Sequence, residues 1–104
     1  YKSIIIFTDK YYSVEIANVE RPSWVELEEG ETRSTDDIVN AYEGLISNSG
    51  TYMIKGDSLI REAIVAKYPN YMNDWPRTAN YFNLSGDEFT TEGSRGTWTY
   101  RRLK

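Results

Sequence analysis

The chain contains neither cysteine nor histidine among its 104 residues. Without cysteine there is no disulfide, no thiolate nucleophile and no cysteine-ligated zinc site. Without histidine the chain lacks the most common general base and the most common transition-metal ligand, so a Ser-His-Asp triad is excluded. These absences weigh against an enzyme, and we expect no metal and no cofactor.

Long hydrophobic runs and concentrated positive charge are also missing. The longest apolar run covers residues 4–7, whereas a membrane-spanning helix needs about 20 residues. The 12 basic residues are outnumbered by 16 acidic ones, which gives a net charge of -4. Nucleic-acid binding depends on neutralising phosphates with basic side chains. We therefore expect neither a membrane span nor a nucleic-acid partner.

The sequence is instead rich in short segments in which apolar and polar residues alternate. Residues 52–59 and 82–89 are near-duplicates, each with a Gly-Asp corner (Gly56-Asp57 and Gly86-Asp87) between alternating residues. A glycine at such a corner supplies the positive φ that a tight hairpin needs. The whole pattern predicts seven β-strands, at residues 3–8, 11–17, 50–55, 58–68, 77–84, 88–91 and 96–103.

One segment has helical rather than strand periodicity. Ser34 is suited to cap a helix, with Asp37 three residues later in a capping-box arrangement. This pattern predicts one short α-helix near residues 35–47 whose apolar face packs on the sheet: Ile38, Ala41, Tyr42, Leu45 and Ile46.

The predicted elements indicate one domain, residues 1–104, that is all-β: an antiparallel up-and-down β-barrel. The chain is long enough for a single hydrophobic core but not for two. The strand at 58–68 is too long to stay flat, so it should coil or carry a bulge. Seven strands leave one unpaired gap, which either an eighth strand preceding Tyr1 or another chain, such as a second copy in a homodimer, would fill.

Short motifs spread along the whole chain carry a family resemblance. They are Ile6-Phe7-Thr8-Asp9-Lys10-Tyr11-Tyr12-Ser13-Val14, Arg21-Pro22, Asn48-Ser49-Gly50-Thr51-Tyr52 with Gly56-Asp57, Ile64-Val65-Ala66-Lys67-Tyr68-Pro69-Asn70-Tyr71-Met72, and Leu84-Ser85-Gly86-Asp87 with Thr99-Tyr100-Arg101-Arg102. In their order and spacing they resemble the bacterial lipocalin-like domain family.

The resemblance implies a lipocalin-like barrel and says more about architecture than about chemistry. Members of the family begin with a Gly-x-Trp strand, which is not in this sequence and matches the expected eighth strand. In lipocalins generally, an arginine on the last strand packs over that tryptophan. The residue that corresponds to this arginine here is Arg102, with Tyr100 in place of the motif's tryptophan.

Strand parity suggests which side chains face the barrel interior. If Lys55 faces water, Tyr52 and Ile54 face inward, and alternation extends the inner face to every second residue of the other strands. On the strand at 58–68 this choice selects Ile60, Glu62, Ile64 and Ala66. The predicted ligand-binding residues are Tyr12, Tyr52, Glu62, Asn80, Phe82, Trp98 and Tyr100.

These residues can be interpreted in two ways. Apolar walls with a few convergent polar groups are typical of a small-molecule site. Small barrels are also often filled by their own side chains, in which case the same phenols would bond to the backbone. Glu62, as a carboxylate on an apolar face, would have to act on a ligand, pair with an arginine or face water. Tyr71, Met72 and Trp75, in the loop at 69–76, would form a lid or a plug at one end of the barrel.

Three functions remain open on the sequence alone. The first is a module that binds a small hydrophobic or amphipathic molecule inside the barrel. The second is an isomerase or cyclase that uses Glu62 or a tyrosine as acid or base. The third is a structural or interaction module that completes its barrel with a strand of another chain.

Overall fold

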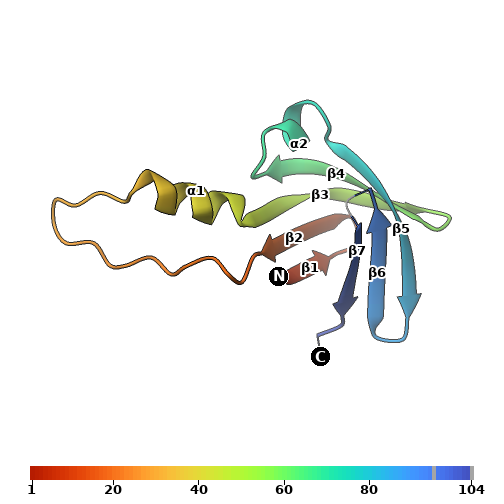
Figure 1. The fold of residues 1–104 in the computed structure, drawn as a ribbon. Coiled ribbons are helices and arrows are strands. Elements are labelled where there is room, and N and C mark those ends of the chain that lie inside the picture. Colours follow the sequence, from red (N-terminus) through yellow and green to blue (C-terminus); the bar gives the residue numbers. More distant parts are fainter. Residues whose placement is uncertain (95, 104) are drawn as a thin grey trace.

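The computed structural model describes residues 1–94 and 96–103, and these form a single seven-stranded antiparallel sheet. Each strand pairs with the next in sequence, so the sheet order follows the chain. The sheet curls until its last strand comes beside its first (Figure 1), which confirms the predicted near-closed barrel. The strands are β1 (Lys2–Phe7), β2 (Tyr11–Ala17), β3 (Leu45–Lys55), β4 (Ser58–Ala66), β5 (Arg77–Ser85), β6 (Glu88–Gly93) and β7 (Gly96–Arg101).

β1 and β7 are the two edges of this sheet, and side chains rather than a backbone ladder connect them. Among the described residues, β1 pairs only with β2 and β7 only with β6. Across the seam the rings of Tyr1 and Trp98 meet edge to face, with centroids 5.8 Å apart. Ser3 forms a side-chain hydrogen bond with Tyr100, and the rings of Phe7 and Phe89 meet edge to face between β1 and β6. Among the described residues, side-chain contacts thus connect the two edges.

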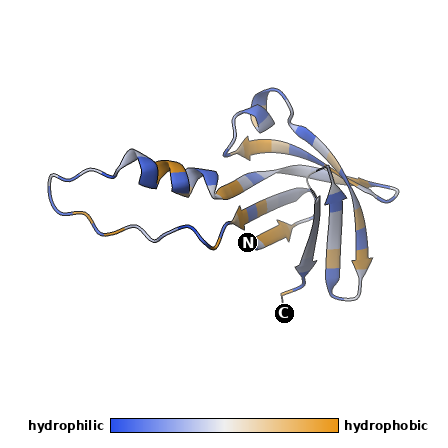
Figure 2. Ribbon diagram, in the orientation of Figure 1, coloured by the Kyte–Doolittle hydropathy of each residue, from blue (hydrophilic) through white to orange (hydrophobic). Residues whose placement is uncertain are grey.

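The core lies on the inner face of β2. Tyr12, Val14 and Ile16 are only 4%, 2% and 7% exposed, while the side chains between them point outward. This is the period-two alternation of a half-buried strand, and Figure 2 shows it as bands of opposite hydropathy along the sheet. Four partly buried hydrophobic residues pack against this core: Ile5, Ile46, Tyr52 and Trp98.

The predicted helix is present but shorter than expected. α1 spans Thr35–Glu43, and its N-cap Ser34 accepts a hydrogen bond from the backbone N–H of Asp37, as the sequence predicts. The prediction that it continues to residue 47 is wrong, because Leu45 and Ile46 pair with β2 as the first residues of β3. At the helix end, the Lys67 ammonium group donates to the backbone carbonyls of Tyr42 in the last turn and of Leu45 at the start of β3.

The expectation that α1 packs its apolar face on the sheet is also wrong. No side chain of the helix is buried, and Ile38, Val39 and Tyr42 are each more than 40% exposed. Figure 1 shows the reason: α1 runs outward in line with β3, together with the long loop that precedes it. The last apolar positions of the predicted face belong to the strand, so the helix contacts the barrel only at its C-terminal end.

β3 and β4 pair closely because Gly50 has no side chain. A Cβ on Gly50 would lie 1.9 Å from the backbone oxygen of Glu62 on β4. The register shifts between Ser49 and Gly50, so one extra residue of β4 is accommodated as a bulge. This confirms the prediction that the long strand departs from flat pairing, although β4 ends at Ala66 rather than Tyr68.

The loop predicted at 69–76 contains a second helix, the single turn α2 (Asn70–Asn73), which contacts β4. It was not expected from the sequence, whose aromatic residues suggested an irregular segment. In the part of the chain that the structure describes, neither helix has the length and apolar character to cross a membrane.

Candidate functional site

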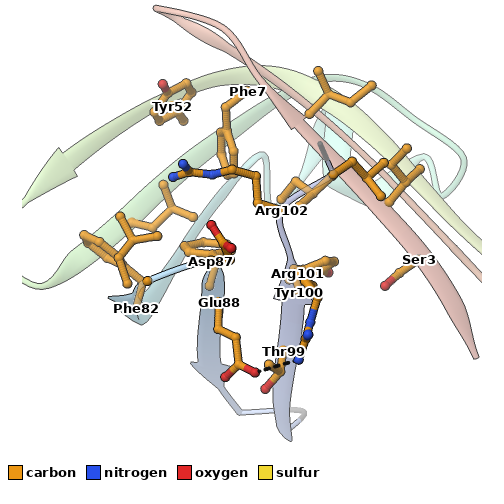
Figure 3. A pocket seen from close by; sticks show the side chains of 18 of the residues that line it. Ser3, Phe7, Tyr52, Phe82, Asp87, Glu88, Thr99, Tyr100, Arg101 and Arg102 are labelled. Carbon is orange, nitrogen blue, oxygen red and sulfur yellow. Dashed lines mark hydrogen bonds and ion pairs between the residues drawn. The ribbon is translucent and has the colours of Figure 1, made fainter.

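A cavity of about 740 Å³ opens on the interior of the barrel between β1, the β3–β4 hairpin and the strands β5 to β7. It lies at the end of the barrel that contains the Gly86-Asp87 turn, and Asp87 is seen at its rim in Figure 3. Its wall is largely apolar, because the inner faces of six strands converge here. Each of these strands contributes an inward side chain: Ile5, Tyr52, Leu59, Phe82, Phe89 and Tyr100.

Five aromatic side chains, which we call the aromatic wall, line the cavity: Phe7, Tyr52, Phe82, Phe89 and Tyr100. Phe7 meets Tyr52 and Phe89 edge to face, with ring centroids 4.9 Å and 5.7 Å apart. Phe89 in turn lies 6.2 Å from Phe82 and 6.0 Å from Tyr100. Each ring therefore has at least one ring neighbour, within the separations at which aromatic pairs stabilise one another.

Charged residues gather at the mouth of the cavity. Arg102 extends its guanidinium group into the cavity in Figure 3, and its backbone N–H donates to the carbonyl of Asp87 at 2.8 Å. Next to it, Arg101 and Glu88 form an exposed ion pair at 3.2 Å. The arginine that the family resemblance singled out thus lines the cavity at the mouth rather than in the core.

A second arginine, Arg61, lies beyond the cavity on the inner face of β4. Arg61 donates from Nη2 to Oδ1 of Asn80 at 2.8 Å. Its guanidinium carbon lies 5.5 Å from the ring centroid of Tyr12, in the range of a cation–π contact. Its Nε is buried and has no hydrogen-bond acceptor among the residues that the structure describes.

The polar groups around Arg61 are mostly engaged with one another. The Tyr12 hydroxyl donates to Oδ1 of Asn48 at 2.7 Å, which ties β2 to β3. The Asn80 amide donates to the backbone carbonyl of Glu92 on β6 at 3.4 Å. Gly93 makes room for this amide, because a Cβ there would lie 2.3 Å from Asn80 Nδ2. This end of the barrel is therefore occupied by an internal hydrogen-bonded cluster.

The two tyrosines near Arg61 are held in their neutral form. Burial raises the pKa of Tyr12 above 10, and the nearby Arg61 charge only partly opposes the shift. Burial likewise raises the pKa of Tyr100, against smaller lowering effects of its hydrogen bond with Ser3 and of Arg61. Both phenols therefore keep their proton at neutral pH.

The structure distributes the predicted ligand-binding residues over three places. Tyr52, Phe82 and Tyr100 line the cavity. Tyr12, Asn80 and Trp98 face the interior but lie in the core or the polar cluster beyond it. Whether any of them binds a ligand stays a prediction.

Glu62 does not face the interior, and the parity predicted for its strand is wrong. It is exposed and pairs with Thr51 and Arg77, whereas Leu59 and Arg61 face inward. The signal was in the sequence: a two-residue turn at Gly56-Asp57 sets Ile54 opposite Leu59, so an inward Ile54 requires an inward Leu59. Counting across that turn would have found Arg61, which the sequence analysis missed.

The expected lid or plug is not found over this cavity. None of Tyr71, Met72 and Trp75 lines it. Met72 and Trp75 are 45% and 61% exposed, and Tyr71 lies near the ring of Tyr68 at the end of β4. Tyr71 therefore has a ring neighbour at the end of β4, away from the cavity.

Within residues 1–94 and 96–103, no three or more carboxylates come together in an arrangement that could hold a metal ion. The polar atoms that face the interior are amides, phenols, hydroxyls and the Arg61 guanidinium. Such a set suits hydrogen bonding and anion binding rather than metal coordination.

Comparison with known proteins gives one match. The model of a family described as a lipocalin-like domain matches residues 3–99. No curated protein and no solved structure matches the chain.

Proposed function

Because this chain belongs to the lipocalin-like domain family, we propose that it binds a small apolar or amphipathic molecule inside its barrel. The observation that carries the proposal is the apolar cavity of about 740 Å³. Its volume lies within the range of about 300–1,000 Å³ that is usual for small-molecule sites. The aromatic wall offers several ring faces and edges to a ligand at low cost in side-chain entropy.

The cavity has the composition expected of a specific site. Apolar side chains form most of its surface, and a few polar groups converge on it, including the Tyr52 and Tyr100 phenols and Arg102. The Tyr52 hydroxyl is already bonded to the Thr8 carbonyl at 2.6 Å. Burial of apolar ligand surface would thus supply most of the affinity, and the polar groups would fix orientation.

Binding is tested with a neutral fluorescent probe, N-phenyl-1-naphthylamine, whose emission rises in an apolar site. We expect saturable enhancement with the native chain. Leu84→Trp places a larger side chain in the cavity wall and should weaken probe binding by about tenfold. Tyr81→Trp, three residues earlier on the outer face of β5, is the matched control and should bind as the native chain does.

Absence of probe binding, or equal binding by the Leu84→Trp variant, would contradict this function. The unpaired edges of β1 and β7 favour a second candidate, a module that completes its barrel with a strand from another chain. Light scattering on the same samples over a range of concentrations separates the two. A monomer at all concentrations that binds the probe favours the small-molecule site, whereas association that abolishes probe binding favours strand addition.

A further inference from the structure

Arg61 is a cation in the barrel interior without an ion-pair partner in the described part of the chain. It sits on the inner face of β4, opposite Tyr52 on β3 and Thr78 on β5. The interior faces of the paired strands contain no aspartate or glutamate, and the ion pair that the structure records, Arg101 with Glu88, lies outside. An interior charge without an opposite charge is unfavourable unless a partner is supplied.

The neighbours of Arg61 offer too few acceptors for its donors. A guanidinium group carries five N–H donors. The structure gives it one acceptor, Asn80 Oδ1, and the face of the Tyr12 ring. The Tyr12 hydroxyl is itself a donor to Asn48, and the buried Nε has no acceptor at all. The missing acceptors must come from outside the set of described side chains.

Arg61 is close to the cavity of the proposed function. Leu59, two residues before it on the same strand and about 7 Å along it, is part of the cavity wall. Tyr52, its partner on β3, is part of the same wall. Tyr100 lines the cavity as well and lies near enough to Arg61 for the two to interact electrostatically. Arg61 therefore has three neighbours in the cavity wall, and two of them, Tyr52 and Tyr100, belong to the aromatic wall.

We propose that the ligand is an amphiphile with a carboxylate head group, which binds Arg61 while its apolar part occupies the aromatic wall. This inference rests on the proposed function, since it names the class of molecule that the same barrel holds. The carboxylate is planar and accepts two parallel N–H donors from one guanidinium group. It would supply both the missing charge and the missing acceptors.

Arg61 suits this role better than Arg102, the other arginine near the cavity. Arg102 is exposed at the mouth, where water solvates it and the backbone of Asp87 is its neighbour. An anion bound there gains little, because solvent and salt screen exposed ion pairs. Arg61 is less exposed than Arg102 and lies on the inner face of the sheet beside the Tyr12 ring, so an anion bound there would be less screened by water.

The test compares two amphiphiles that differ only in the head group, dodecanoate and dodecan-1-ol. Each is titrated against the native chain loaded with N-phenyl-1-naphthylamine, and its affinity is obtained from displacement of the probe. We expect dodecanoate to bind at least about tenfold more tightly than the alcohol.

Variants identify the residue that sets this preference. Arg61→Met should weaken dodecanoate binding at least about tenfold and leave dodecan-1-ol within about twofold of the native value. Arg61→Lys keeps the charge but not the planar fork, so an intermediate preference is expected. Arg77→Met is the matched control, because it removes one positive charge from the outer face of β5 and should change neither affinity. Circular dichroism and the thermal midpoint establish that each variant is folded, and Arg61→Lys keeps the test decisive if Arg61→Met does not fold.

The outcomes separate this inference from the function on which it rests. If the probe and the alcohol bind but dodecanoate shows no advantage, the carboxylate inference fails and small-molecule binding stands. If the advantage disappears in Arg102→Met and persists in Arg61→Met and Arg61→Lys, the head group binds at the mouth, and the role of Arg61 is wrong. If neither the probe nor either amphiphile binds, the proposed function itself fails.

Discussion

The two ends of this barrel are built from the same strands but are stabilised by different interactions. At the end that contains the polar cluster around Arg61, which we call the inner end, Tyr12 bonds to Asn48, Arg61 bonds to Asn80, and Val14 is 2% exposed. At the cavity end, rings meet rings with few hydrogen bonds between side chains, and about 740 Å³ is left open. The difference indicates that polar cross-links between strands stabilise one end of the barrel, whereas the other end has room for the proposed ligand.

The comparison predicts that the largest loss of stability follows from disturbing the inner end at Gly50. Gly50→Ala brings a Cβ against the backbone of Glu62, which neither strand can avoid without separating β3 from β4. We expect a loss of about 3 kcal/mol or more in the free energy of unfolding, measured by urea denaturation.

The control for this change is Gly56→Ala at the cavity end. A Cβ on Gly56 meets nothing within 4 Å, but its φ of +62° is unfavourable for alanine. The expected loss is therefore smaller, about 1 kcal/mol. Equal losses for the two variants would show that the close contact between β3 and β4 is not what stabilises the inner end.

A smaller effect should follow from removing one phenol hydroxyl at each end. Tyr12→Phe leaves the partly buried Oδ1 of Asn48 without its donor, for an expected loss of about 1–2 kcal/mol. Tyr52→Phe removes a bond to the Thr8 carbonyl, which water can solvate in its place, so about 0.5 kcal/mol is expected. Urea denaturation measures the loss of stability in both variants. A greater loss in Tyr52→Phe than in Tyr12→Phe would contradict the view that hydrogen bonds stabilise the inner end more than the cavity end.

The smallest effect concerns pH and sharpens the same comparison. Because folding raises the pKa of Tyr12 and Tyr100 above 10, their contribution to stability is fully present below pH 10 and is lost as the pH rises through the folded-state pKa values. The urea midpoint of the native chain should therefore fall above pH 10, and the midpoint of the Tyr12→Phe variant should fall less steeply. A flat profile up to pH 11 would contradict the burial of these phenols.

Period-two patterning was sufficient to predict most of the fold. The alternation of Tyr12, Val14 and Ile16 and the two Gly-Asp turns specify antiparallel hairpins, because each side chain must face either the core or water. The helix end was missed for a physical reason: Leu45 and Ile46 fit both a helical and a strand pattern, and pairing with β2 decides between them. The local sequence pattern alone does not reveal that long-range pairing.

The site was predicted in part, and its errors have one source. Tyr52, Phe82 and Tyr100 were placed correctly because their strands alternate clearly. Glu62 was placed inside because the isoleucines beside it suggested an apolar face. The register across the Gly56-Asp57 turn overrides that local pattern and turns Arg61 inward instead. The cavity itself depends on how tightly seven strands curl, which no single segment determines.

The seam between β1 and β7 has a consequence for how a ligand would reach the interior. Elsewhere around the barrel, opening a passage would break backbone hydrogen bonds between paired strands. At the seam the contacts that the structure records between the described residues are those of side chains, and opening it would separate Ser3 from Tyr100, Tyr1 from Trp98 and Phe7 from Phe89. The barrel can therefore open locally between β1 and β7 without unfolding the rest of the sheet. Among the strands, hydrogen exchange of the backbone amides should be fastest in β1 and β7.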